Sequence, residues 1–472
     1  MTAGGIGELT RRLRRGELTV VEHVERVLTA IRERDTAGAY VTAAGEEALR
    51  AAAEADARIR ERGAAAWAGA PLLGVTVSVK DLLQTRDLPT TRGSLLPNRR
   101  PRLAAPAVAR LRAAGAVVVG KTTTSEYGWS ASTVGPVAPP TRNPYDPARS
   151  AGGSSGGAAA AVATGLGDGA LGTDGSGSVR IPAAFCGVVG YKPSYGRIPY
   201  HPNGADRLAH QGTLARSVTD AAALAAAVAG PHPDDPDSGL GSIDAARRAG
   251  RPRRVGWIEY EGTSEPVRRV TERACAALAA LGHRVERIEV RCDHLYPALV
   301  DILAAAEAAG TSSADEEHCD PGRLAVVRHG RTLRGADVMR AEEVRQELRL
   351  KLRSVMGTYG LLAMATVPIE PFAADAIGPA WAADPRDLLW LAWSPASYPF
   401  NMTGQPAVSL PAGLTDAGLP AGVQLAGPVG ADHAVLAAAH RLQTELGTLP
   451  PPPARPGRPA AAPALSASER TR

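Results

Sequence analysis

The chain has 472 residues, 44% of them apolar and 21% charged, which is typical of a folded globular protein and excludes a wholly disordered chain. Its net charge is +5, and the four arginines and one glutamate of segment 449–472 supply +3 of this charge. The rest is nearly neutral, and five arginines between 247 and 254 are more typical of a solvated linker than of a phosphate-binding patch, so we expect no nucleic-acid partner.

Helical patterns fill the N-terminal part, where Thr19 and Glu22 form a capping box ahead of a periodic apolar run. Helices and strands then alternate along the chain, at 44–62 (helix), 74–81 (strand), 105–115 (helix) and 116–119 (strand). We interpret the Gly-, Pro- and Asp-rich segment 230–243 as a linker or surface insertion. After it the pattern predicts strands at 253–260, 284–290, 361–369, 407–411 and 421–428, and helices at 264–282, 337–357 and 431–447. This alternation predicts an α/β fold, a single large domain with a mixed, twisted β-sheet surrounded by helices.

Lys80 ends the alternating segment 74–81, on the same side of the predicted strand as Thr76 and Ser78. A charged lysine that faces inward there would be unfavourable. The side chain either extends its amine to the surface or is neutralised by burial, which would let it act as a base near neutral pH. The residues alone leave both interpretations open.

Residues 152–157 read GGSSGG and are followed by small helix-forming residues at 158–162. A flexible linker is one interpretation. A glycine–serine turn that runs into a helix is also the geometry of an anion or oxyanion site, because the first N–H groups of a helix have no partner within it. The helix-forming residues that follow favour the second interpretation.

A third segment, 172–182, reads GTDGSGSVRIP and is too rich in glycine for a helix or a central strand, so we expect a loop. Successive N–H groups in such a turn form a nest for a developing oxyanion. A phosphate loop is the competing interpretation, but neither glycine-rich segment contains GK[ST] or a GxGxxG after a strand. The histidines are scattered without an HExxH motif, so we expect no metal and no cofactor.

Lys80, GGSSGG and GTDGSGSVRIP, in this order, resemble the amidase signature family. The similarity continues through FCGVVGYKPSYGRIP and GTLARSVTDAA and returns at 399–413 and 418–427, so it covers most of the chain. It implies an amidase signature domain over 1–448, with helices in 1–62, a signature core at about 73–217 and a C-terminal half at 250–448. Segment 449–472, which holds seven prolines and many alanines, is expected to be a disordered tail.

The resemblance implies a Ser–cis-Ser–Lys triad. Ser178, which precedes Val-Arg, would be the nucleophile, and Ser154 the bridging serine after a cis Gly153–Ser154 peptide. Lys80 would be the base. In its neutral form it would take a proton from Ser154, which takes one from Ser178.

The resemblance assigns the oxyanion hole to four successive backbone N–H groups, those of Gly175, Ser176, Gly177 and Ser178. Members of the family often have a branched residue and two glycines before the nucleophile, so Ser176 departs from the pattern and makes a shift in substrate preference possible. We expect Asp174 and Arg180 to fix the turn by hydrogen bonds, and Ser155 to be a supporting hydrogen-bond donor.

Tyr127 and Trp129 are the expected pocket residues and favour an aryl or apolar acyl group, with packing in the core as the alternative for each. Lys121 and Lys192 are interpreted as surface or loop lysines. Cys186 is interpreted as a buried structural residue.

We expect an amide hydrolase that cleaves the C–N bond of a small carboxamide through a Ser178 acyl-enzyme, giving a carboxylic acid and ammonia or an amine. Three alternatives stay open: a glutamine-dependent amidotransferase subunit that works with partner chains, an acyltransferase that forms an amide, and a catalytically silent binding protein. Four cysteines without a CxxC pair, no signal-like N-terminus and no apolar run of about 18 residues predict a cytoplasmic protein without a membrane partner. The sequence leaves a homo-oligomer open.

Overall fold

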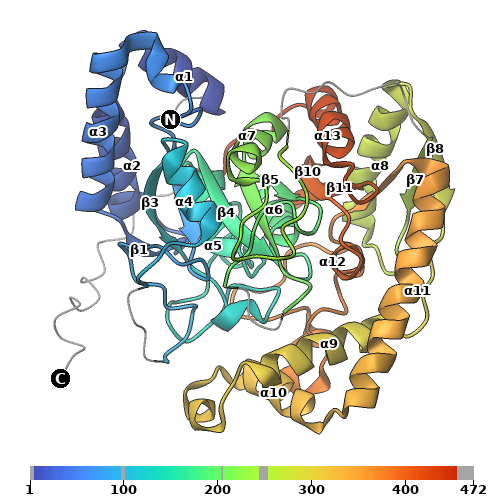
Figure 1. The fold of residues 1–472 in the computed structure, drawn as a ribbon. Helices are drawn as coiled ribbons and strands as arrows, with labels where there is room; N and C mark the ends of the chain where they lie inside the picture. Colours follow the sequence, from blue (N-terminus) through green and yellow to red (C-terminus); the bar gives the residue numbers. More distant parts are fainter. Residues whose placement is uncertain (1–4, 97–100, 203–205, 244–253, 454–472) are drawn as a thin grey trace.

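The structure is a computed structural model that describes residues 5–96, 101–202, 206–243 and 254–453. One sheet of eleven strands runs through this part, in the order β1-β3-β2-β4-β6-β5-β10-β11-β9-β7-β8 (Figure 1). In chain order the strands are β1 (Tyr40–Ala43), β2 (Thr76–Lys80), β3 (Val117–Thr122), β4 (Gly169–Asp174), β5 (Val189–Lys192), β6 (His210–Ala215), β7 (Arg254–Ile258), β8 (Arg284–Ile288), β9 (Leu361–Ala365), β10 (Ala407–Leu414) and β11 (Pro420–Ala426).

The sheet is mixed. β2 is parallel to β3 and β4, and β7 is parallel to β8 and β9, whereas the other neighbours are antiparallel. The predicted α/β fold, one large domain built on a mixed sheet, is confirmed. The domain boundary at 448 stays a prediction.

Helices cover both faces of the sheet (Figure 1). They are α1 (Gly5–Arg14), α2 (Val20–Arg34), α3 (Glu46–Arg62), α4 (Pro106–Ala113), α5 (Gly156–Thr164), α6 (Arg180–Cys186), α7 (Val218–Val228), α8 (Glu265–Ala280), α9 (Leu295–Ala309), α10 (Pro321–Thr332), α11 (Gly335–Tyr359), α12 (Pro399–Met402) and α13 (Asp432–Leu446). α5 and α6 pack on one face, and α7, α8 and α13 cover the other through a core of Ala, Val and Leu. α9, α10 and α11 pack together beside the sheet.

Local sequence signals mark several of these elements. The Thr19 hydroxyl accepts the N–H of Glu22 at 3.1 Å, and the Glu22 carboxylate accepts the N–H of Thr19 at 2.9 Å, so the predicted capping box opens α2. Among the described residues, no helix is long and apolar enough to cross a bilayer. Residues 454–472 of the expected disordered tail (449–472) and most of the arginine cluster at 247–254 lie outside the described residues.

The prediction of a loop over 172–182 is wrong at both ends. Gly172 belongs to β4, a central strand between β2 and β6, and α6 begins at Arg180. A side chain at Gly172 would begin 3.0 Å from Ser155 Oγ. Glycine is therefore needed in this strand because the start of α5 packs directly on it.

Lys121 and Lys192 are fully buried, against the expectation of surface lysines. Lys121 Nζ forms an ion pair with Asp81 Oδ1 at 2.9 Å and donates to Thr90 Oγ1 at 2.7 Å. Lys192 Nζ donates to the carbonyl of Pro193 at 3.2 Å and to that of Gln405. Both amines have polar partners inside the protein, which a strand pattern alone does not show.

Candidate active site

Lys80, Ser154 and Thr173 meet at the carboxyl ends of β2 and β4. The two strands are parallel neighbours, so their carboxyl ends lie at the same edge of the sheet. Lys80 Nζ lies 2.7 Å from Ser154 Oγ and 2.9 Å from Thr173 Oγ1. The structure thus places the lysine against the first serine of the GGSSGG segment.

The Lys80 amine does not reach the surface, since its side chain is 0% exposed. Among the described residues no carboxylate forms an ion pair with it. Burial lowers the pKa of Lys80 to about 7, and the Asp174 carboxylate opposes this shift only in part. A large fraction of the lysine is therefore neutral at physiological pH, as a proton acceptor must be.

The chain turns tightly just before Ser154. The peptide bond between Gly153 and Ser154 is cis, as the resemblance implied. A side chain at Gly153 would begin 2.1 Å from the carbonyl oxygen of Ser132, so only glycine fits. This close approach fixes the backbone that presents the Ser154 hydroxyl to Lys80.

Ser178 precedes α6 and is 8% exposed. Its carbonyl accepts the N–H of Ser155 at 3.1 Å, and Ser155 Oγ donates to the Thr173 carbonyl at 3.0 Å. Ser155 thus ties the loop that contains Ser178, the candidate nucleophile, to β4. In the described residues the hydroxyls of Ser154 and Ser178 are not hydrogen-bonded to each other.

Asp174 and Arg180 form an ion pair at 2.9 Å, and both side chains are completely buried. The Asp174 carboxylate also accepts the N–H of Gly177 at 2.7 Å and that of Val179 at 3.1 Å. Burial raises the pKa of Asp174, but the Arg180 guanidinium outweighs it and holds this pKa below its usual value. The pair therefore fixes the turn that carries Ser178.

The engagement of Gly177 corrects the predicted oxyanion hole, because one of its four N–H groups is already bound to Asp174. No acceptor within the described ranges binds the N–H groups of Gly175, Ser176 or Ser178. A side chain at Gly177, where φ is +123°, would begin 2.5 Å from Ser397 Oγ. That hydroxyl donates to the Ser176 carbonyl at 2.7 Å, so Ser176 is held although it departs from the glycine pattern.

Three residues that hold this loop, Ser397, Asn401 and Gln424, were not identified from the sequence. Arg180 donates to the Ser397 carbonyl at 2.9 Å and to Gln424 Oε1 at 2.7 Å. Asn401 Nδ2 donates to the Asp174 carbonyl at 2.7 Å. Asn401 and Gln424 fall inside the C-terminal segments that resemble the family, which is the signal that would have indicated them.

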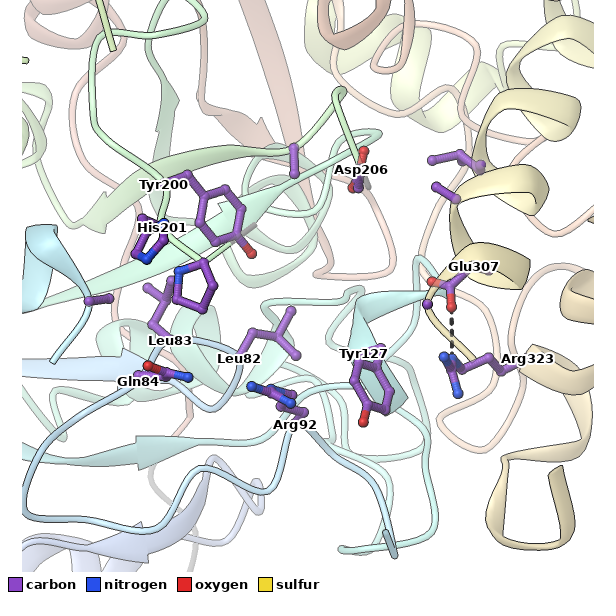
Figure 2. A pocket seen from close by; sticks show the side chains of 16 residues that line it. Leu82, Leu83, Gln84, Arg92, Tyr127, Tyr200, His201, Asp206, Glu307 and Arg323 are labelled. Carbon is purple, nitrogen blue, oxygen red and sulfur yellow. Dashed lines mark hydrogen bonds and ion pairs between the residues drawn. The ribbon is translucent and has the colours of Figure 1, made fainter. Parts of the chain in front are cut away.

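The protein has a cavity of about 320 Å³, and Figure 2 shows the side chains that line it. Leu82 and Leu83, which follow β2, line it, as does Tyr127, whose neighbour Gly128 lies against Ser154 Oγ. Asp206, also a lining residue, lies against Gly175 of the nucleophile loop. Lys80, Ser154 and Ser178 are not among its lining residues, but these two contacts bring the cavity next to the segments that carry Ser154 and Ser178. The cavity is large enough for a small molecule.

The two predicted pocket residues differ in position. The Tyr127 ring lines the cavity, with the Arg323 guanidinium 4.2 Å from its centroid. Trp129 is 7% exposed and packs in the core against Trp390, with 6.3 Å between ring centroids. Trp129 is therefore a core residue, which was the alternative interpretation of its role.

The remaining sequence candidates have structural surroundings. Cys186 is fully buried, and burial raises the pKa of its thiol, so it is not a reactive thiolate. Within the part of the chain that the structure describes, no group of three or more His, Cys, Asp or Glu side chains is placed to hold a metal ion.

A sequence model of the family named Amidase matches residues 22–436. The chain belongs to the amidase signature family. It is 36% identical to the A subunit of the glutamyl-tRNA(Gln) amidotransferase from Thermus thermophilus, over 92% of this chain and 95% of that protein. A crystal structure of an amidase superposes with a TM-score of 0.82 and 30% identity, covering 94% of this chain and 100% of that one. A 6-aminohexanoate cyclic dimer hydrolase superposes with a TM-score of 0.80 and 28% identity, over 94% and 97%.

We expect Arg180→Ala to lower the free energy of unfolding by about 3–5 kcal/mol, because Asp174 would stay buried without its cation. Denaturant unfolding followed by circular dichroism measures this change. Arg269→Ala is the matched control, since it removes the same charge from a solvated pair with Asp416 and should change stability little. Equal small losses in the two variants would contradict the prediction.

Proposed function

We propose that this chain is an amide hydrolase that cleaves a small carboxamide through an acyl-enzyme on Ser178. The supporting observation is the 2.7 Å hydrogen bond between the buried Lys80 amine and Ser154 Oγ. A serine hydroxyl is a weak nucleophile without a base. An ordinary lysine, with a pKa of about 10.4, would be protonated at neutral pH and useless as a base. The buried Lys80, with a pKa of about 7, meets this requirement.

In the proposed reaction neutral Lys80 accepts the Ser154 proton while Ser154 Oγ accepts that of Ser178. Ser178 Oγ then bonds to the carbonyl carbon, and the π electron pair of the carbonyl moves to its oxygen. The unoccupied N–H groups of Gly175, Ser176 and Ser178 are the available donors for this oxyanion. Thr173 positions the lysine, since Lys80 Nζ lies 2.9 Å from its hydroxyl.

Collapse of the tetrahedral intermediate re-forms the carbonyl and breaks the C–N bond. The protonated Lys80 returns its proton through Ser154 to the leaving nitrogen, which departs as ammonia or an amine. Water, deprotonated by the same relay, then attacks the Ser178 ester and releases the carboxylic acid. The free hydroxyl of Ser178 is regenerated, so the cycle closes with one amide and one water consumed.

Ser178→Ala should lower kcat by about a thousandfold or more, since the acyl-enzyme no longer forms. A steady-state assay over aryl, aliphatic and peptide-terminal amides measures the loss. A fluorophosphonate probe should label the wild-type peptide that contains Ser178, as read by mass spectrometry. Ser354→Ala, at an exposed serine of α11 that does not line the cavity, is the control. Retained turnover in Ser178→Ala would place the nucleophile elsewhere.

The rate should depend on pH through Lys80. Because the neutral lysine is the active form, kcat/KM should rise with pH and level off above about pH 7. Lys80→Arg should remove this activity, since arginine stays protonated at every usable pH. Lys351→Arg, on the helix α11, is the matched control. Substantial activity in Lys80→Arg would refute the proton relay.

A second candidate, a glutamine-dependent amidotransferase subunit, is favoured by the 36% identity to the Thermus thermophilus amidotransferase protein over nearly the whole chain. Both functions would form an acyl-enzyme on Ser178, and they differ in the fate of the ammonia. Ammonia release from glutamine is therefore measured with the chain alone and with added amidotransferase partner subunits. Release that requires those subunits supports the amidotransferase, whereas hydrolysis of simple amides by the isolated chain supports the hydrolase.

A further inference from the structure

One carboxylate in the cavity has no cationic partner. Asp206 lines the cavity, and its Oδ1 accepts the N–H of Leu208 at 2.8 Å. In the described ranges no Lys, Arg or His forms an ion pair with it. The other acidic lining residue, Glu307, is paired with Arg323 at 2.8 Å. Asp206 therefore brings the unpaired negative charge to this space.

Asp206 lies next to the loop that carries Ser178. Its Oδ2 is 3.4 Å from the point where a side chain on Gly175 would begin. Figure 2 shows it on the cavity wall, facing the space shared with Tyr200 and Glu307. Burial is the main cause of the raised pKa values of Tyr200 and Glu307, and the negative charge of Asp206 raises both pKa values further.

The nearest cations are engaged elsewhere. Arg345 donates to the carbonyl of Met402 and to Glu342 and forms no ion pair with Asp206, although its charge opposes the rise in the pKa of Asp206 in part. Arg92 lines the cavity too, but it lies 5.9 Å from the centroid of the Tyr127 ring and makes no ion pair with Asp206. Within the described ranges Asp206 thus has no cation in direct contact, so a cation brought by a ligand can still pair with it.

An unpaired carboxylate at this position is unfavourable for two reasons. Asp206 is partly buried, and partial removal of a charge from water without an ion-pair partner raises its free energy, so burial raises the pKa of Asp206. A negative charge beside Gly175 also repels the oxyanion that would form at the neighbouring N–H groups. A cation brought by the substrate would remove both penalties.

We propose that Asp206 binds a protonated amine of the substrate, so that the site selects small amides carrying an ammonium group in the part that fills the cavity. This inference rests on the proposed function, because it assigns the substrate class of that same site. Arg92 would favour a carboxylate instead, so an anionic substrate is the opposing outcome.

The test uses linear amides matched in length that end in an ammonium, a methyl or a carboxylate group. Binding to the Ser178→Ala variant is measured by calorimetry, and kcat/KM is measured with the enzyme that retains Ser178. The ammonium-ended amide should be favoured over the methyl-ended one by about tenfold or more in both measurements. Asp206→Asn should abolish this preference for the ammonium-ended amide. Asp416→Asn, which removes one negative charge from an exposed pair, should preserve it.

The inference would be overturned if Asp206→Asn and the parent protein showed the same preference for the ammonium-ended over the methyl-ended amide. It would also be overturned if the parent protein preferred the carboxylate-ended amide and Arg92→Gln removed that preference. The binding arm needs no turnover, so it decides the inference even when no amide is hydrolysed. If the enzyme hydrolyses the methyl-ended amide through Ser178 but does not prefer the ammonium-ended one, the proposed function stands and this inference alone is refuted.

Discussion

The buried ion pair of Asp174 and Arg180 is the contact on which the geometry of the site depends. Asp174 ends β4, and its carboxylate binds two N–H groups of the next turn. Arg180 begins α6 and reaches Gln424 of β11 and the carbonyl of Ser397. One pair thereby connects the strand, the nucleophile loop, a helix and the C-terminal half. These bonds hold the loop that carries the remaining N–H groups, which is the preorganisation that stabilisation of an oxyanion requires.

Burial disfavours the charged form of both Lys80 and Asp174, but the outcome differs between the two groups. No carboxylate of the described residues forms an ion pair with Lys80, so burial dominates and favours its neutral form. Asp174 has Arg180 in contact, and the charge of that partner keeps it ionised despite burial. The site therefore holds a neutral base and a charged structural acid at the same pH. This separation of pKa values supports the assignment of Lys80 to proton transfer and of Asp174 to loop geometry.

Patterns that depend on neighbouring residues were predicted well from the sequence. The capping box of α2 and the strand that ends at Lys80 need only residues a few positions apart. The glycine-rich β4 was missed, because Gly172 packs against Ser155 and Gly169 against Leu224, and a local backbone preference does not show such contacts. The mostly apolar α9 was missed as well, since a helix apolar on nearly every side shows little of the 3.6-residue periodicity.

The motifs indicated the proposed catalytic residues, but not the side chains that position them or that line the cavity. Ser397 and Gln424 bind a loop more than 200 residues earlier in the chain, a distance that no local pattern spans. The burial of Lys121 likewise depends on Asp81, which follows the neighbouring strand β2. The cavity combines side chains from the segment after β2, the turn at Tyr127 and the helices α9 and α10. Because these segments are far apart in the chain, the sequence did not show which charged residues line the cavity together.

The Ser–Lys arrangement by itself does not distinguish a hydrolase from an amidotransferase subunit, because both would begin with an acyl-enzyme and release ammonia. The difference must come from what the cavity admits and where the ammonia goes. An ammonium-binding Asp206 fits amino amides in general, and glutamine is one of them, so the charge of Asp206 narrows the substrate class without deciding between the two functions. Dependence on partner subunits decides that question, since the same acyl-enzyme chemistry is then either productive alone or coupled to a second protein.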